Sequence, residues 1–167
     1  MHIETDRLIL RYFTPADAAD LHEILGDDET MKNCEPAYDF DKTQSFLESF
    51  CIAKKAALAA VQKESGKVIG YILFKPLEDG IYEIGWFFNK SHWRQGYAYE
   101  SCSALIACAF DSLNVHKIVA ETIDSQKSVK LMEKLGMKRE GVQRSQTKDN
   151  DGNWTDLYLY GILRDDR

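Results

Sequence analysis

The chain has 167 residues, of which 44% are hydrophobic and 29% charged, as in an ordinary soluble globular protein. No apolar run approaches the roughly 20 residues that a membrane helix needs, and the polar N-terminus does not resemble a signal peptide. The four cysteines show no metal-ligand spacing and indicate reduced thiols, so we expect one cytoplasmic domain over residues 1–167 with no metal site.

The first half of the chain predicts strands and helices bounded by clear turn signals. Thr14 and Pro15 mark the start of a helix, because Thr is a good N-cap and Pro suits the first helical position. Gly66 and Gly80 lie in the turns that separate the later strands. The expected elements are strand 8–13, helix 14–25, helix 41–55 with Phe46, Leu47, Phe50 and Cys51 inward, and strands 56–63, 68–77 and 81–88.

The second half predicts a long helix, a short helix and a final pair of strands. Apolar residues recur at helical spacing from Ala98 to Leu113, which is typical of a helix with one buried face. The elements after it are strand 117–123, helix 126–135 ended by Gly136, and strands 138–147 and 154–163. Together the elements predict a mixed α/β domain with a mostly antiparallel sheet and about four helices.

Negative charge is concentrated near the N-terminus. Between Thr14 and Glu48 there are ten acidic and two basic residues, a local charge of −8 within a net charge of −6. Such a lobe attracts cations and repels nucleic acid, so we expect no nucleic-acid partner. The same charges can also belong to solvated helix faces, and both interpretations stay open here.

The segment Trp93-Arg94-Gln95-Gly96-Tyr97-Ala98 lies between the aromatic strand 81–88 and the long helix. A strand, a short loop with glycine and a helix direct several backbone N–H groups into one hollow at the helix N-terminus. Such a hollow binds phosphate, because these amides lack partners and the helix dipole favours an anion. Most junctions of this kind are only connections, so the interpretation needs support from other segments.

Further motifs occur along the chain in a fixed order. The chain opens with Glu4-Thr5-Asp6-Arg7-Leu8, and Trp93-x-x-Gly96-x-Ala98 follows the aromatic strand. The late helix carries Ser128-x-x-Leu131-Met132-Glu133-Lys134-Leu135-Gly136, and Asp151-Gly152-Asn153-Trp154 precedes the last strand. In this order they resemble the GNAT superfamily of acetyl-CoA-dependent N-acetyltransferases, and within it the ribosomal-protein-alanine, or RimJ/RimL-like, branch.

The resemblance implies a single GNAT-like domain whose seven-stranded sheet is splayed in the middle, after the aromatic strand. It also implies acetyl-CoA as the co-substrate, with its pantetheine arm paired to the exposed strand end like an added strand. The implied cofactor-binding residues are Trp86, Phe87 and Phe88 at the strand end, Arg94, Gln95, Gly96, Tyr97, Ala98 and Tyr99 around the pyrophosphate, and Ser125. Phe87 and Phe88 face opposite sides of the sheet, so one of them must pack in the core.

Two positions depart from the family pattern. Ser125 stands where members usually carry asparagine, and Met132 where many carry a tyrosine that acts as the acid. Methionine cannot release a proton, so the resemblance to the RimJ/RimL-like branch implies Ser128 as the acid for the departing thiolate. A main-chain N–H near Phe88 would stabilise the oxyanion.

Acetyl transfer also requires a neutral amine. An α-amino group with a pKa near 8 loses its proton at pH 7 for about 1.4 kcal/mol, whereas an amine with a pKa near 10.4 requires over about 4 kcal/mol. A water held by a carboxylate suffices for the first. Glu83 is the leading candidate for that carboxylate, with Glu121 and Asp156 as alternatives. We expect direct transfer, because the cysteines of the long helix have no base nearby in sequence.

Three functions remain open. The first is acetylation of a protein N-terminal amine, and the second is acetylation of a small cationic amine such as a polyamine or aminoglycoside. The acidic segment fits a basic ribosomal-protein tail and a small cation equally. The third is a non-catalytic acyl-CoA sensor, which Met132 and Ser125 favour. We expect a monomer or homodimer without a membrane partner.

Overall fold

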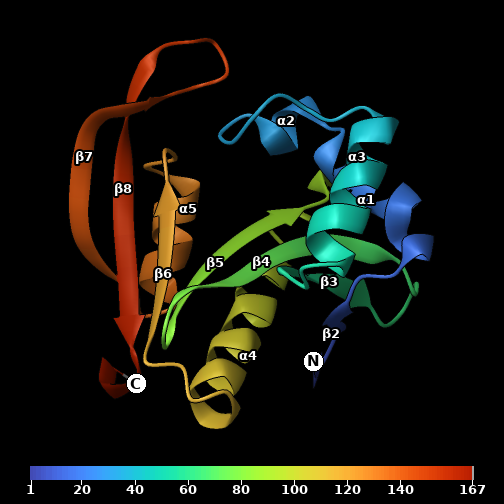
Figure 1. Ribbon diagram of the computed structural model, residues 1–167, viewed down its shortest axis with the longest axis horizontal. Coiled ribbons are helices and arrows are strands. Elements are labelled where there is room, and N and C mark those ends of the chain that lie inside the picture. Colours follow the sequence, from blue (N-terminus) through green and yellow to red (C-terminus); the bar gives the residue numbers. More distant parts are fainter. Residues whose placement is uncertain (167) are drawn as a thin grey trace.

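The computed structural model describes residues 1–166, whose eight strands form one sheet in the order β1-β2-β3-β4-β5-β6-β8-β7 (Figure 1). The strands are β1 (His2–Glu4), β2 (Leu8–Tyr12), β3 (Ala57–Gln62), β4 (Val68–Glu78), β5 (Ile81–Phe88), β6 (Lys117–Thr122), β7 (Lys138–Lys148) and β8 (Trp154–Leu163). All neighbouring strands are antiparallel except β5 and β6, which are parallel. The helix α4 connects these two strands.

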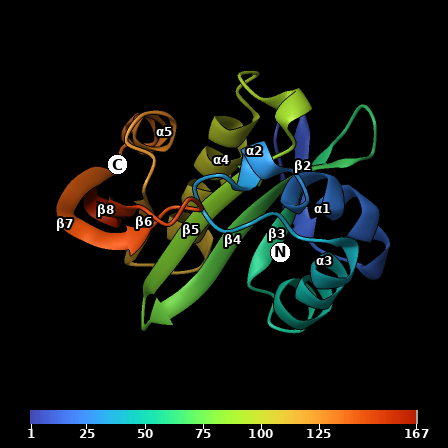
Figure 2. The ribbon, with the colours of Figure 1, turned by 90° about the horizontal axis from the view of Figure 1, so that it is seen from above.

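The helices lie on both faces of the sheet. They are α1 (Ala18–Leu25), α2 (Asp28–Met31), α3 (Phe40–Phe46), α4 (Tyr97–Ser112) and α5 (Lys127–Lys134), with a 3-10 turn at Pro15–Asp17 before α1 and a π-helix at Leu47–Ile52 after α3. Figure 2 shows α4 and α5 on one face and α1 and α3 on the other. No helix among residues 1–166 is long and apolar enough to cross a membrane.

The α/β class predicted from the sequence is confirmed, and β5 and β8 begin and end at the expected residues. The structure adds β1 and α2, so there are eight strands and five α-helices among the described residues instead of seven and four. Both additions are too short, at three and four residues, to produce a hydrophobic period. The helix expected over 41–55 is α3 followed by the π-helix, and it ends at Ile52.

Helix α1 is started by a buried carboxylate. Thr14 donates to Asp17 Oδ2 from its backbone N–H at 2.7 Å and from its hydroxyl at 3.0 Å, and Arg11 donates two bonds at 2.8 and 2.9 Å. Asp17 is only 6% exposed. Burial alone would raise the pKa of Asp17, but the bonds from Arg11 and Thr14 lower it on balance. Thr14 is the N-cap, as expected, and Asp17 supplies the interactions that hold it.

Most acids of the N-terminal lobe are engaged in structural contacts. Asp27 and Asp39 accept backbone N–H groups at the starts of α2 and α3, and Asp20 accepts the N–H of Val68. Glu23 pairs with Lys67, and Glu35 accepts from Tyr38 and Lys42. Many acids of this segment therefore cap helices and hold loops, whereas the carboxylates of Asp28, Glu29 and Asp41 form no hydrogen bond or ion pair within residues 1–166.

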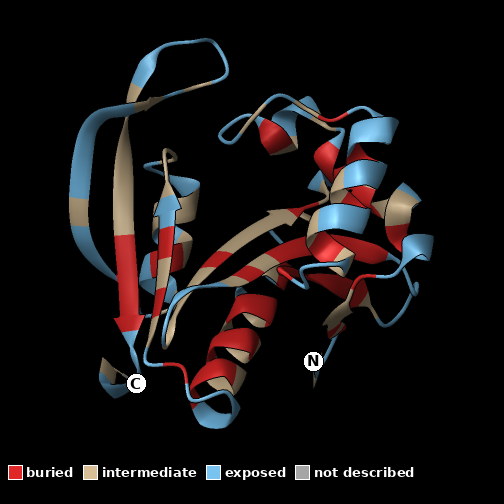
Figure 3. Ribbon diagram, in the orientation of Figure 1, coloured by how far each residue is buried: buried red, intermediate tan, exposed pale blue. Residues whose placement is uncertain are grey.

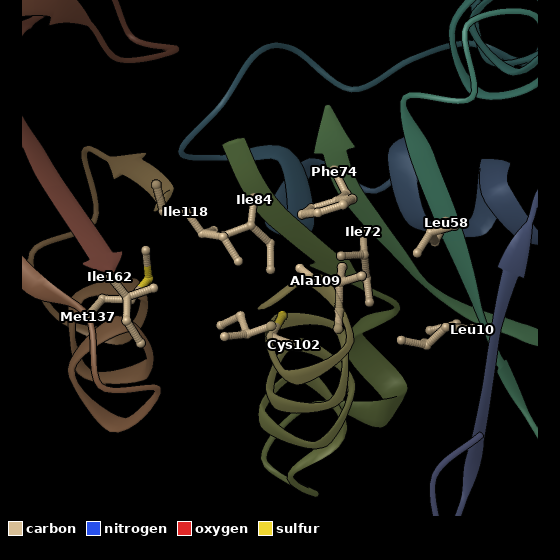
Figure 4. Packing of buried hydrophobic residues seen from close by; sticks show 14 of the residues in the cluster. Leu10, Leu58, Ile72, Phe74, Ile84, Cys102, Ala109, Ile118, Met137 and Ile162 are labelled. Carbon is tan, nitrogen blue, oxygen red and sulfur yellow. The ribbon is translucent and has the colours of Figure 1, made fainter. Parts of the chain in front are cut away.

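Two apolar cores cover the two faces of the sheet. The α4 face includes Ile84, Ile118 and Cys102, shown with their neighbours in Figure 4. The opposite face packs Tyr71 and Leu47 against α1 and α3. Burial is deepest along the inner side of α4 and the central strands, whereas β7 is exposed over most of its length (Figure 3). The two cores pack against β4 and β5 from both faces of the sheet, next to the place where β5 leaves its parallel neighbour.

Candidate active site

The sheet opens in its middle. Strands β5 and β6 pair only from Ile81 to Glu83 opposite Lys117 to Val119, and then diverge, as both ribbon views show (Figures 1 and 2). A cleft of about 780 Å³ lies in this opening. Its walls come from β5, β6, the start of α4, one side of α5, the α2 region and the β7–β8 hairpin. The cleft therefore passes through the sheet and connects its two faces.

The β5 edge in this opening carries unpaired backbone groups. Asn89 donates its N–H to the carbonyl of Ile69 at 2.9 Å, so the alternation of antiparallel bonds turns the amides of Trp86 and Phe88 away from β4. No strand of residues 1–166 pairs with β5 on that side beyond Glu83. The carbonyl of Phe88 accepts the indole N–H of Trp93 at 2.7 Å. The N–H of Phe88 remains directed into the cleft.

A loop with two left-handed residues leads from β5 into α4. Arg94 has a φ of 60° and Gly96 a φ of 86°, and helix α4 begins at Tyr97. No side chain caps this helix, so the first-turn N–H groups of Tyr97, Ala98 and Tyr99 have no partner within it. A hollow lined by free amides at the positive end of a 16-residue helix is suited to an anion.

Arg7 holds this loop from the other side. Its Nη1 donates to the carbonyl of Gln95 at 3.0 Å, and its Nε donates to Glu100 at 2.7 Å. The guanidinium carbon also lies 4.1 Å from the centre of the Tyr97 ring. Thr5 donates to the same Glu100 carboxylate at 2.6 Å. The chain's opening motif therefore fixes the phosphate-type loop, a role that the sequence motif alone does not reveal.

The structure brings most of the predicted cofactor residues together. Trp86, Phe87, Phe88, Arg94, Gly96, Tyr97, Ala98 and Tyr99 all line the cleft. The side chain of Phe88 is the one that packs in the core, 6% exposed, while Phe87 lies on the other face beside Tyr71. Gln95 and Ser125 are absent from the lining: Gln95 donates to the carbonyl of Ser91, and Ser125 is exposed.

Two carboxylates face the cleft on the α1 side of the sheet. Glu83 shares the face of Phe87, and Glu121 lies opposite to the core residues Ile118 and Ala120 on β6. Lys75 Nζ lies 2.8 Å from Glu83 Oε2, and Glu83 is 19% exposed. Desolvation is the main cause that raises the pKa of Glu121, and the negative charge of Glu83 raises it further. The positive charge of Lys75 has the opposite, smaller effect.

Ser128 lies on the other face of the sheet. It is half-buried in the cleft wall, near the start of α5, where Asp124 accepts the backbone N–H groups of Gln126, Lys127 and Ser128. The carboxylate of Asp124 thus stabilises the start of this helix. Met132 is 1% exposed and packs in the core. The candidate acid and the candidate bases are therefore on opposite faces of the sheet, on either side of the opening.

The remaining candidates lie outside this arrangement. Asp156 is not part of the cleft lining, and its carboxylate accepts the N–H of Ser145 at 2.8 Å. Cys102 is fully buried on α4, and burial raises the pKa of its thiol to about 12. A thiol that stays protonated at neutral pH is a poor nucleophile. Cys108, on the same helix, is half-buried.

Sequence reasoning missed two parts of the cleft. Asn33 and Cys34, after α2, line it on the α1 face, opposite Thr147 and Lys148 of the β7–β8 hairpin. Asn150 at the hairpin tip donates to the carbonyl of Met31 at 3.3 Å and so spans the top of the opening. Only the closeness of segments more than 100 residues apart reveals this wall. The second part is a row of lysines on α5: Lys127, Lys130 and Lys134.

Comparison with known proteins assigns this architecture. The family model described as an acetyltransferase (GNAT) domain matches residues 7–138. The uncharacterized N-acetyltransferase YnaD of Bacillus subtilis (strain 168) is 31% identical over 170 residues, covering 99% of each chain. The crystal structure of a GNAT-family acetyltransferase from Bacillus anthracis is 30% identical, with a TM-score of 0.90 and 99% of each chain covered.

Two more distant structures share the fold. One is the spermidine N-acetyltransferase of Vibrio cholerae in complex with CoA and spermine, 21% identical, with a TM-score of 0.84 and 97% and 98% of the chains covered. The other is the ribosomal-protein-S5-alanine acetyltransferase of Vibrio fischeri, 20% identical, with a TM-score of 0.82 and 99% and 98% covered. Their names state different acceptors, so they do not define the acceptor of this chain. The match over most of its length and the relatives named N-acetyltransferases show that this chain belongs to the GNAT family of N-acetyltransferases.

Proposed function

We propose that this chain moves an acetyl group directly from acetyl-CoA to a primary amine, and that the amine is the N-terminus of a polypeptide, as in the RimJ/RimL-like branch. The observation that carries the proposal is one continuous cleft. It runs from the amide-lined loop before α4, along the free edge of β5, to two carboxylates on the opposite face. Family membership makes the reaction an N-acetylation, and the cleft suggests the part each residue plays.

The residues of the cleft fit coenzyme A on structural grounds. The free N–H groups at the start of α4 suit a diphosphate, and Gly96 leaves this approach open without a side chain. The unpaired amides of Trp86 and Phe88 suit the amide-bearing pantetheine arm, which can pair as an extra strand does. Bound acetyl-CoA would supply an activated acetyl thioester at the opening of the sheet.

Each catalytic task has a candidate group. Glu83, with Glu121 as the second choice, would hold the water that takes the proton of the incoming amine on the α1 face. The N–H of Phe88 would donate to the developing oxyanion. Ser128, on the α4 side, would donate a hydrogen bond to the leaving sulfur, whose thiol pKa of about 8.5 makes it a fair leaving group. No covalent enzyme intermediate is required.

The charges near the acceptor favour an amine with a single positive charge. Most acids of the N-terminal lobe already hold backbone amides or lysines, and Glu83 is paired with Lys75. Within residues 1–166, Glu29 and Glu121 are the carboxylates of the cleft lining that form no ion pair or hydrogen bond. Lys148 adds a positive charge to the same part of the cleft. A polyamine would need several unpaired carboxylates, whereas a peptide N-terminus needs one. Its lower amine pKa, near 8, also suits a weak carboxylate base.

The test is acetyl transfer by the purified chain with a panel of amines, followed by mass spectrometry. The panel contains short peptides with free N-termini, the same peptides with blocked N-termini and an internal lysine, spermidine and an aminoglycoside. Acetylation of the free N-terminal peptides alone is the expected result. Preferential acetylation of spermidine or the aminoglycoside would refute the choice of acceptor. Binding of acetyl-CoA without any acetylated product would refute the catalytic proposal.

Glu83→Gln tests the base. We expect the rate to fall about a hundredfold at pH 6.5 and much less at pH 9, because at high pH the amine is neutral without help. Glu78→Gln is the matched control, since Glu78 is an exposed glutamate at the end of the neighbouring strand β4 and does not line the cleft. A Glu83→Gln enzyme with an unchanged pH profile would transfer the role to Glu121.

A further inference from the structure

The cofactor side of the cleft has a basic wall. Lys127, Lys130 and Lys134 are spaced three and four residues apart on α5, which places them on one face of the helix. All three line the cleft, opposite the loop that begins α4. We call these three residues the α5 lysine face.

Two of these lysines reach across the cleft to the phosphate-type loop. Lys127 Nζ lies 5.1 Å from the centre of the Trp93 ring, and Lys134 Nζ lies 4.3 Å from the centre of the Tyr99 ring. Trp93 comes just before the loop and Tyr99 is the third residue of α4. The positive charges thus flank both ends of the segment whose backbone N–H groups are free.

The α5 lysine face forms no ion pair within residues 1–166, whereas lysines such as Lys67, Lys90 and Lys117 are paired with carboxylates. The acids nearest in sequence have other partners: Asp124 accepts backbone amides of α5, and Glu133 accepts the hydroxyl of Tyr160. Other lysines in the described part of the chain, such as Lys54 and Lys55, are also unpaired, but these three lie together along one wall of the cleft.

Helix stability does not account for the arrangement. Lys127 is the first residue of α5, where the helix dipole disfavours a cation, and the first turn carries no acidic residue. Like charges at neighbouring positions of one helix face also repel each other. Three exposed lysines that share one wall of the cleft and form no ion pair among the described residues are therefore suited to an anionic ligand.

The chemistry of coenzyme A suggests which anion this is. Besides the diphosphate, the nucleotide carries a separate phosphate monoester on the ribose 3′ position, and this group cannot use the amides already engaged by the diphosphate. We infer that the α5 lysine face is a subsite for the 3′-phosphate of coenzyme A. The inference rests on the proposed function, because it requires the diphosphate at the start of α4. It assigns the three lysines to the choice of nucleotide and leaves the transfer chemistry unchanged.

The experiment is calorimetric titration of the full chain with coenzyme A and with 3′-dephospho-coenzyme A, at low and moderate salt. We expect the wild-type chain to bind coenzyme A about tenfold more tightly, because exposed lysine–phosphate pairs are individually weak but act together here. The preference should shrink as salt rises, since screening weakens such pairs. Equal affinities for the two nucleotides would overturn the inference and leave the proposed function intact. Binding of neither nucleotide would overturn both.

Variants locate the effect. Changing all three lysines to glutamine should abolish the preference, because it should weaken the binding of coenzyme A much more than that of 3′-dephospho-coenzyme A. Lys54→Gln is the matched control: it removes one exposed lysine that also lies over an aromatic ring, Phe50, at 5.9 Å, but outside the cleft lining. A triple variant that keeps the tenfold preference would contradict the assignment. The wild-type comparison of the two nucleotides remains decisive even if the triple variant folds poorly.

Discussion

Replacing Arg7 with glutamine should weaken the binding of coenzyme A, although Arg7 does not line the cleft. Its guanidinium donates to the carbonyl of Gln95, pairs with Glu100 and lies over the Tyr97 ring. These contacts hold a loop in which Arg94 has a positive φ. A left-handed non-glycine residue costs about 1–2 kcal/mol, so the loop needs external support to keep this shape.

The size of the effect follows from these contacts. The charged hydrogen bond to Gln95 is worth about 1.5 kcal/mol. The pair with Glu100 adds about 0.5–1 kcal/mol, because the Arg7 side chain is 44% exposed and solvent screens the charges. The contact with the Tyr97 ring adds about 0.5 kcal/mol. In the variant, water replaces part of these interactions, so the binding-competent loop conformation should lose about 2 kcal/mol of stability. A loss of this size in the binding-competent conformation lowers affinity about tenfold to thirtyfold.

Calorimetry with coenzyme A measures this loss, and steady-state kinetics gives the KM for the amine. We expect the Kd for coenzyme A to rise and the KM for the amine to stay constant, because the acceptor side of the cleft is built from other segments. Arg7→Lys should recover part of the affinity, since it keeps the charge. Arg144→Gln, an exposed arginine of β7 outside the cleft lining, is the control. A wild-type Kd in Arg7→Gln would refute the reasoning, and equal changes in both constants would indicate general disruption.

Three further variants test other parts of the structure. Gly96→Glu should weaken coenzyme A binding by about tenfold or more. The substitution forces a residue with a side chain to adopt a φ of 86°, and it places a carboxylate beside the free amides. An unchanged Kd in calorimetry would show that this loop is not the anion site. Asp17→Asn should cost about 2–4 kcal/mol in urea unfolding, because Arg11 loses a buried partner, and a loss under about 0.5 kcal/mol would contradict this. Because pairing lowers the pKa of Asp17, the wild-type advantage is present above the ordinary value of 3.8 and should disappear as the pH falls through the lowered value. For Glu121 the sign is opposite: its pKa is raised above 4.5, so the wild type should lose stability as the pH rises through the raised value, and thermal melting of Glu121→Gln should show no such loss.

The elements with a strong local signal could be predicted from the sequence. Strand β5 is bounded by Gly80 and a polar loop, and α4 has a long apolar face, so both were placed within a residue or two. The same signals locate the loop between them, and its binding of phosphate stays a prediction. Strand β1 and helix α2 were missed, because they are too short to show a period and depend on tertiary contacts.

The candidate site was only partly predictable for a different reason. Family motifs identify the residues of β5 and the loop, because these lie in one stretch of chain. The contact of Arg7 with Gln95 and that of Asn150 with Met31 join segments 88 and 119 residues apart, and no local pattern encodes them. The predicted role of Ser125 in binding the cofactor stays a prediction, and this exposed residue is not part of the cleft lining.

The placement of the free β5 edge also has a consequence for solubility. An unpaired strand at the rim of a sheet is a template on which other chains can add, and proteins commonly protect such rims with charges, as β7 does here with its exposed lysines and arginines. The unpaired amides of β5 lie instead at the centre of the sheet, with β6 and α5 beside them. A slender ligand can reach them, but a strand that belongs to another folded sheet would collide with these neighbours. The fold thus leaves these unpaired backbone groups accessible to a ligand and protects them from pairing with a strand of another molecule.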